Sequence, residues 1–246
     1  MGLEINLDFA VPFNPNLNPP SIVRPYEGIT EGLLGVFQLD NTPAPLQPVA
    51  GTSGATGTFS GAPTSTRLGY KFKNNDLIDT GIVPGSGLNG MTLFCVARKT
   101  GVVPSGAANV ASPMCVGNPN SAAFRMELED PDVLYANTAI NADLAIPLRD
   151  DVSRFDLYVV TYSDSGSKMY RPRIRPEPVS SATTIANIGA AQLDQTFRIG
   201  TSGTGLAWAE AEVMVAGVFA RALSDAEVLE QYAAMQAYAA PLGVIL

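Results

Sequence analysis

The hydrophobic and polar positions of this chain follow a strand-like pattern over most of its 246 residues. Short segments of apolar residues, alternating with polar ones or continuous, are separated by clusters of Gly, Pro, Ser, Asn and Asp. Strands are predicted at 32–40, 91–99, 112–117, 122–130, 154–162, 167–175 and 196–200, with two short strands in 67–82 about a turn at 74–76 and one or two strands in 209–223. A loop is predicted at 42–66. Many short strands between frequent turn signals are typical of an antiparallel sandwich.

One helix is predicted, at 224–240. Ser224 and Glu227 have the spacing of a capping box, in which the serine caps the helix and the glutamate bonds back to its backbone. The apolar residues that then share one face of the helix are Val228, Tyr232, Met235 and Ala239. Pro241 cannot continue the helix, so the element is predicted to end there.

The first 31 residues differ from the rest of the chain. Every odd position from Leu3 to Phe13 is apolar, which predicts a strand, and the prolines that follow predict an extended, semi-rigid arm. We therefore divide the chain into an arm at 1–31 and a body at 32–246. The strand either joins the local sandwich or adds to a neighbouring subunit. For the second alternative, the predicted contact residues are Ile5, Leu7, Phe9, Phe13 and Tyr26.

Composition limits the possible partners. Hydrophobic residues make up 46% of the chain, enough for a sizeable core, and charged residues only 15%. A largely uncharged polar surface fits faces buried against neighbours, and it equally fits a plain β-domain. The net charge of −8 disfavours binding to nucleic acid. No membrane helix or signal peptide is visible, so we expect neither membrane insertion nor classical secretion.

The chain contains no histidine and two cysteines. Ser-His-Asp and Cys-His nucleophiles and histidine zinc sites are therefore excluded. Cys95 and Cys115 lie in apolar runs, where buried free thiols are expected, although a bridge between neighbouring strands is the alternative. No cofactor is predicted from these residues.

Two features could contact a ligand. The basic run at 168–175 places Arg171, Arg173 and Arg175 on one side of a strand by its period-of-two spacing. Such a side is either solvated or at an interface, or it contacts an anion or a glycan. Trp208 follows a glycine-rich loop, where it either stacks on a sugar or packs between the sheet and the final helix.

Paired carboxylates raise the question of glycoside hydrolysis, which uses two such groups. Glu127 and Glu129 share one strand face, as do Glu210 and Glu212. Neither pair has a third acid at the next alternate position, and solvent-facing glutamates opposite an apolar face explain both. The sequence therefore predicts that the protein is not an enzyme.

Several segments resemble the laminin G-like, concanavalin A-like jelly-roll family. The matching segments are LLGVFQLDN (33–41), SGATGTFSGAP (53–63), GYKFKNNDLIDTG (69–81), MTLFCVARK (91–99), RFDLYVVTYSDSGSKMYRPRI (154–174) and the closing stretch from Phe197 to Val228. The resemblance covers about 30–240 and implies an all-β, two-sheet antiparallel jelly-roll sandwich with a short C-terminal helix. Many family members bind calcium through Asp and loop oxygens, which makes Asp40, Asp76 and Asp79 calcium candidates here.

Stand-alone members of this family without a signal resemble accessory proteins of tailed bacteriophages. This resemblance implies a non-enzymatic virion protein, either a capsid decoration protein or a tail or fibre component, assembled in the host cytoplasm. Its arm would anchor it to neighbouring subunits, so its partners would be other virion proteins, itself and cell-surface glycans. The alternative is a carbohydrate-binding, lectin-like adhesion module, and a glycan-active hydrolase is the third hypothesis.

Overall fold

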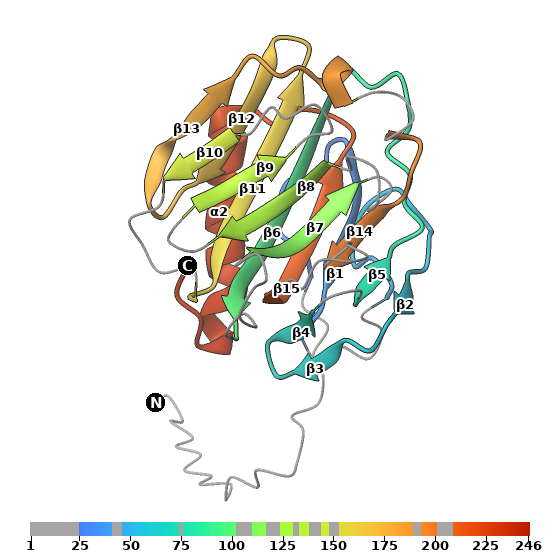
Figure 1. Ribbon diagram of the computed structural model, residues 1–246, viewed down its shortest axis with the longest axis vertical. Helices are drawn as coiled ribbons and strands as arrows, with labels where there is room; N and C mark the ends of the chain where they lie inside the picture. Colours follow the sequence, from blue (N-terminus) through green and yellow to red (C-terminus); the bar gives the residue numbers. More distant parts are fainter. Residues whose placement is uncertain are drawn as a thin grey trace, which may run out of the picture.

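A computed structural model describes residues 25–40, 46–73, 76–101, 110–116, 124–129, 133–137, 144–147, 153–188, 193–200 and 209–246. Within these ranges the chain forms two antiparallel sheets, and one α-helix lies near the C-terminus (Figure 1). The predicted two-sheet sandwich is therefore confirmed. Within the same ranges, no helix combines the length and the apolar character that crossing a lipid bilayer requires.

The first sheet, called sheet A, contains the central strands of the fold. Its order is β13 (Arg175–Ser181), β12 (Gly166–Arg171), β11 (Asp156–Ser163), β6 (Gly90–Thr100), β15 (Glu210–Phe219), β4 (Gly69–Phe72) and β3 (Thr64–Thr66). A further strand, β1 (Leu33–Gln38), also pairs with β15. Segments far apart in the sequence are thus neighbours in this sheet, and β15 brings the C-terminal part of the chain between β6 and β4.

The second sheet, called sheet B, packs against one face of sheet A. Its order is β10 (Leu144–Pro147), β9 (Val133–Asn137), β8 (Phe124–Glu129), β7 (Val110–Val116), β14 (Phe197–Gly200), β5 (Leu77–Asp79) and β2 (Thr58–Ser60). Two short 3-10 helices, η1 (Ile185–Ile188) and η2 (Ala240–Leu242), complete the described elements. The segment 42–66, predicted as a loop, therefore contains the two short strands β2 and β3.

The main core fills the space between the sheets. Alternate residues of the central strands point into it, including Leu93 and Cys95 from β6 and Tyr158 and Val160 from β11. Met114 of β7 meets them from sheet B, and all five are fully buried. This alternation is the period of two that the sequence shows.

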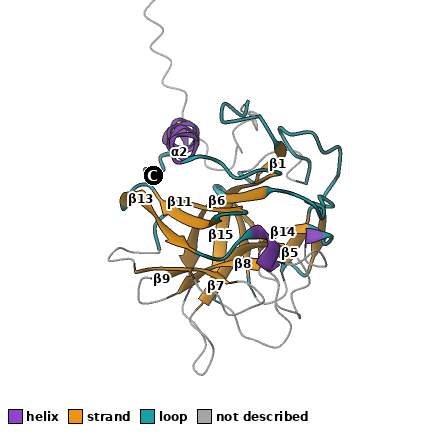
Figure 2. Cartoon of the chain, turned by 90° about the horizontal axis from the view of Figure 1, so that it is seen from above, coloured by secondary structure: helices purple, strands orange, loops and turns teal. Residues whose placement is uncertain are grey.

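The helix α2 (Asp225–Ala239) covers the other face of sheet A (Figure 2). Phe94 and Val96 of β6 point away from the main core and belong to a second apolar cluster with Val228 and Met235 of the helix. The central strands are therefore buried on both faces, which explains the nearly continuous apolar run of β6. The register of β15 shifts between its residues 213 and 215, so the strand changes face at a bulge.

The helix begins as predicted. The backbone amide of Glu227 donates to the side chain of Ser224 at 3.3 Å, and the backbone amide of Ser224 donates to the Glu227 carboxylate at 2.8 Å. This reciprocal pair confirms the capping box. The helix ends at Ala239, two residues before Pro241.

The strand predicted at 167–175 is interrupted, so the predicted row of three arginines is wrong. β12 ends at Arg171, and a turn closes where the backbone amide of Ile174 donates to the Arg171 carbonyl at 3.0 Å. β13 then starts at Arg175, which lies directly opposite Arg171 across the pair. Pro172 has no amide to donate to a ladder, which favours a turn at this position.

Candidate functional site

An open pocket of about 380 Å³ lies on the face of sheet A that is turned away from sheet B. Its lining contains the strand residues Thr66, Lys71, Arg98 and Glu212, Arg67 and Leu68 from the turn between β3 and β4, and the segment 242–243. This volume is within the range of small-ligand sites, and its lining combines apolar groups with a few polar ones.

Strand register brings the charged residues of the pocket together. Glu212 on β15 lies directly opposite Lys71 on β4 and directly opposite Arg98 on β6. Residues opposite each other in an antiparallel pair project from the same face of the sheet. The carboxylate therefore lies between two cations that come from different parts of the chain.

Both oxygens of Glu212 accept hydrogen bonds. Thr66 Oγ1 donates to Oε1 at 2.6 Å, and Arg98 donates to Oε2 from Nε at 2.8 Å and lies within 2.6 Å of it through Nη2. The side chain of Glu212 is only 2% exposed, whereas that of Arg98 is 33% exposed. The Arg98 guanidinium also lies 4.6 Å from the ring centroid of Phe155, a cation–π contact. Arg98 is thus held in one orientation, with part of its guanidinium facing solvent.

Glu210 extends this network along the same strand face. Its Oε1 accepts a hydrogen bond from Thr100 Oγ1 at 2.7 Å and lies 3.0 Å from Lys71 Nζ. Burial alone would raise the pKa of Glu210, but the bonds from Thr100 and Lys71 and the charges of Lys71 and Lys73 outweigh it and hold this pKa below its ordinary value. Glu210 is therefore a carboxylate at neutral pH.

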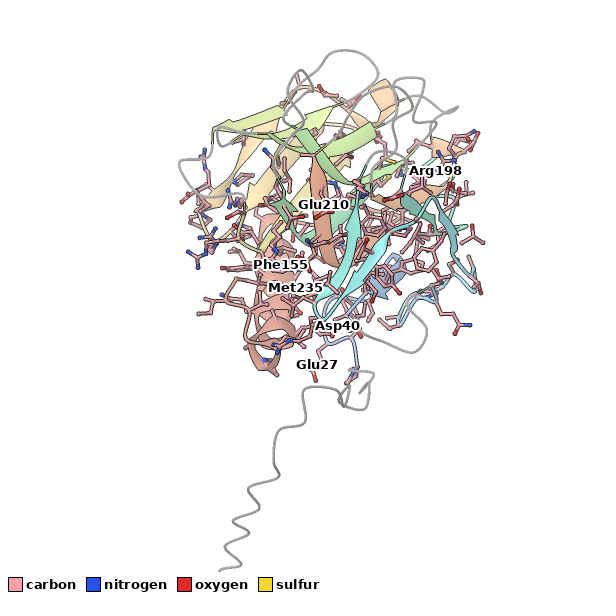
Figure 3. The ribbon with its side chains drawn as sticks, turned by 60° about the horizontal axis from the view of Figure 1, so that its bottom comes forward. Glu27, Asp40, Phe155, Arg198, Glu210 and Met235 are labelled. Carbon is pink, nitrogen blue, oxygen red and sulfur yellow. The ribbon has the colours of Figure 1, made fainter. Side chains whose placement is uncertain are left out.

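The C-terminal segment closes one side of the pocket. Arg67 Nη2 donates to the backbone carbonyl of Leu242 at 2.9 Å, which ties the segment to the turn between β3 and β4. Figure 3 labels Glu210 and Phe155 on the side of the molecule where the helix residue Met235 also lies. The pocket thus offers fixed donors and cations beside an apolar wall, an arrangement that can hydrogen-bond a polar ligand without rearranging.

Arg171 and Arg173, the two arginines predicted to contact a ligand, both lie outside this pocket lining and pair with Asp156. Both guanidinium groups contact Asp156 of β11, Arg171 through a short Nε contact and Arg173 through Nε at 3.1 Å. Arg171 and Asp156 are fully buried, and the side chain of Arg173 is 16% exposed. Arg171 also lies 5.3 Å from the ring centroid of Tyr158 in the main core. In this arrangement Arg171 presents no surface to a glycan.

The three calcium candidates do not converge. Asp40 accepts a short hydrogen bond from the Tyr238 hydroxyl, and Asp76 accepts one from the backbone amide of Ala62 at 2.8 Å. Asp79 pairs with Arg198 at 3.2 Å. Figure 3 shows Asp40 well separated from Arg198. Among the described residues no three acidic or thiol side chains are grouped in a way that could hold a metal ion.

Several other predictions fall on residues outside the described ranges. Trp208 is one of them, as are the arm residues Ile5, Leu7, Phe9 and Phe13. Tyr26 is described, and its hydroxyl donates to Gln231 Oε1 of its own chain at 2.7 Å. Cys95 and Cys115 are both buried and neither forms a disulfide, as the apolar runs around them predict.

The pocket was missed by sequence reasoning, apart from Glu212. The signal that could have found part of the basic region is the segment 67–73, which contains Arg67, Lys71 and Lys73. Lys71 and Lys73 are two positions apart, a spacing that places both on one side of an extended segment, whereas Arg67 lies in the turn before β4. Their proximity to Arg98 and Glu212 depends on the pairing of β4, β15 and β6, which no local pattern reveals.

No protein-family model and no curated protein matches the sequence. Solved structures do share the fold. A mutant of Trypanosoma rangeli sialidase displaying trans-sialidase activity is 12% identical with a TM-score of 0.62. The match covers 85% of this chain and 34% of the sialidase chain. The binding domain of botulinum neurotoxin serotype D is 12% identical with a TM-score of 0.59, and the match covers 83% of this chain and 51% of the toxin chain. A structure from work on botulinum neurotoxin type C, whose cell entry depends on interaction with two ganglioside molecules, is 12% identical with a TM-score of 0.56. The match covers 81% of this chain and 51% of that chain.

These likenesses define the class of the protein as a two-sheet antiparallel β-sandwich of the kind found in sialidases and in toxin binding domains. At these identities they show the fold alone. The chain spans about a third of the length of the sialidases and about half of the toxin chains.

The comparison overturns the prediction that the protein is not an enzyme, because its structural neighbours include sialidases. The prediction rested on the missing third acid beside each glutamate pair, and the sialidase mechanism does not need such a row of acids. Glycoside hydrolysis uses carboxylates, or a tyrosine nucleophile in sialidases, and none of these mechanisms requires histidine.

Proposed function

We propose that this protein is a carbohydrate-binding module and that the pocket around Glu212, Arg98 and Thr66 receives the sugar. The observation that carries the proposal is the hydrogen-bonded network at the pocket wall, in which Glu212 is held at both oxygens and Arg98 is fixed but partly exposed. Sugars present many hydroxyl groups, which pair well with ionised donors and acceptors in fixed positions. Leu68 and Leu242 supply an apolar wall for a sugar ring.

The structural neighbours support the same class of ligand. One neighbour is a sialidase in complex with sialic acid, and another is a botulinum neurotoxin whose cell entry depends on two ganglioside molecules. Each of these ligands carries sugar. A carbohydrate-binding role was the alternative prediction from the sequence, and it now has more support than the virion role.

A glycan array tests this function directly. Fluorescent wild-type protein is expected to bind a restricted set of glycans, and Glu212→Gln is expected to weaken that binding by about tenfold because Arg98 loses the charge that orients it. The matched control is Glu177→Gln on β13, at the opposite edge of sheet A, which should bind like the wild type. Both variants are compared with the wild type by thermal unfolding.

Two results would contradict the proposal. One is an array without signal above background for the wild type, with and without calcium. The other is a Glu212→Gln variant that binds as strongly as the wild type. The same variant serves the hydrolase hypothesis, under which polysaccharide cleavage by the wild type would be lost in Glu212→Gln.

The virion role stays a prediction that the named neighbours do not support. It rests on the proline-rich arm at 1–31 and on the resemblance to phage accessory proteins. If the arm anchors the protein to a particle, a chain lacking residues 1–24 should fail to join particles that the full chain decorates. Undiminished occupancy by the shortened chain would exclude anchoring by the arm.

A further inference from the structure

The pocket is more positive than the chain that contains it. Its lining includes three cations, Arg67, Lys71 and Arg98, against one carboxylate, Glu212. Two further charged residues lie next to this lining: Glu210, which pairs with Lys71, and Lys73, whose charge acts on Glu210. With them the region carries four positive and two negative charges. The whole chain has a formal net charge of −8. A positive pocket on an acidic protein attracts anions locally while the rest of the surface repels them.

Arg67 has no acidic partner among the described residues. Arg67 is exposed, and its guanidinium donates from Nη2 to the neutral backbone carbonyl of Leu242. Because a backbone carbonyl satisfies one donor and leaves the charge uncompensated, Arg67 can still pair with an anion. Its guanidinium geometry suits carboxylate, sulfate and phosphate oxygens.

Glu212 repels an anionic ligand less than an exposed, unpaired carboxylate would. Its two oxygens are occupied by Thr66 and Arg98, and its side chain is 2% exposed. The role of Glu212 is therefore to orient Arg98, a positioning role. Lys71 and Arg98 remain 33% exposed each, so both can reach a ligand in the pocket.

We infer that the pocket selects acidic glycans, with Arg67, Lys71 and Arg98 binding a carboxylate or sulfate group carried by the sugar. The inference rests on the proposed carbohydrate-binding function and specifies the ligand class within it. The neutral part of the glycan would lie along Leu68 and the 242–243 wall.

Matched ligands test the inference. Affinities are measured by calorimetry for a neutral oligosaccharide that the array identifies, the same oligosaccharide with one carboxylate-bearing terminal sugar, and the same with one sulfate. At least one acidic form is expected to bind about tenfold more tightly than the neutral form. This preference should shrink when salt is raised from about 0.05 M to about 0.5 M, because the paired groups are solvent-accessible.

Variants then locate the preference. Arg67→Gln and Lys71→Gln are each expected to bring the ratio of acidic to neutral affinity close to one. Arg175→Gln, on the far edge strand β13, is the matched control and should leave this ratio at its wild-type value. Inorganic sulfate and phosphate serve as competitors, to separate recognition of an acidic sugar from capture of a free oxyanion.

The outcomes separate the two proposals. Equal affinity for acidic and neutral glycans overturns the selectivity and leaves carbohydrate binding intact. Binding to no glycan at all refutes carbohydrate binding and the selectivity with it. If inorganic sulfate or phosphate binds as tightly as the acidic glycan, the pocket is a site for a free anion and the inference is overturned. If the preference for acidic glycans is unchanged in both Arg67→Gln and Lys71→Gln, recognition takes place elsewhere and the inference is overturned as well.

Discussion

Asp156 and Arg171 form an ion pair in which neither side chain is exposed. The pair joins the start of β11 to the end of β12, next to Tyr158 of the main core. Arg173 reaches the same carboxylate oxygen from the following turn, at 3.1 Å. One buried carboxylate therefore holds the β12–β13 connection against the centre of sheet A.

Replacing Asp156 by Asn should destabilise the protein by about 3–5 kcal/mol, because Arg171 would remain buried without a counter-charge. Urea denaturation of the variant measures this loss. The double replacement Asp156→Leu with Arg171→Met is the control, and it should recover most of the stability since it removes both buried charges together. A single variant as stable as the wild type would show that the pair is not buried as described.

The charge of Glu227 makes stability depend on pH in the acidic range. Hydrogen bonds from Arg221 are the largest cause, and they outweigh burial to lower the pKa of Glu227 from 4.5 to about 2. The unfolded chain therefore binds the proton more readily, so the contribution of Glu227 is complete above pH 4.5 and is lost as the pH falls toward 2. The side chain is 28% exposed, and solvent screening limits the effect to about 1 kcal/mol.

Glu227→Gln is expected to be less stable than the wild type by that amount at neutral pH, and the difference should vanish near the lowered pKa. Gln can still take part in the capping box, so the variant isolates the charge. Denaturant titrations at a series of pH values measure the difference. A Glu227→Gln deficit that is constant with pH would contradict the assignment.

How far the sequence predicts this molecule depends on the range of the interactions involved. The sandwich and the capping box at Ser224 follow from alternation and from residues three positions apart, which are local. The contact between Thr66 and Glu212 joins residues 146 positions apart, so it exists only once β3, β4 and β15 have paired in register. The period-of-two argument for Arg171 and Arg173 failed for a local reason, because it assumed a continuous strand through Pro172.

Cys95 and Cys115 should be unreactive in the folded protein. Both are buried and outside any disulfide, and burial raises the pKa of the Cys95 thiol, which keeps it protonated and poorly nucleophilic. A thiol reagent such as a chromogenic aromatic disulfide is expected to label neither cysteine under native conditions and both after unfolding without reductant. Absence of labelling in the unfolded, non-reduced chain would instead indicate a disulfide.

Gln231 fixes the segment that follows the predicted arm. Its Oε1 accepts hydrogen bonds from the Tyr26 hydroxyl at 2.7 Å and from the backbone amide of Ile29 at 3.2 Å. Gly28 packs so closely that a Cβ atom there would lie 2.4 Å from the same oxygen. The segment 25–29 is therefore held against α2 by hydrogen bonds to one buried side chain, in addition to the packing of Tyr26 and Ile29 in the second apolar cluster.

Gln231→Leu should cost about 1–3 kcal/mol, because the Ile29 amide would be left buried without an acceptor. Hydrogen exchange is expected to accelerate in the segment 25–31 and to stay unchanged in the central strands β6 and β11. Gln236→Leu, on the exposed side of the same helix, is the matched control and should leave the N-terminal segment protected. Unchanged exchange in Gln231→Leu would mean that other contacts hold the segment. If the expected result is obtained, the segment from residue 25 onward belongs to the body of the protein. Any arm that reaches a neighbouring subunit then lies within residues 1–24, and a deletion that tests it should end at residue 24.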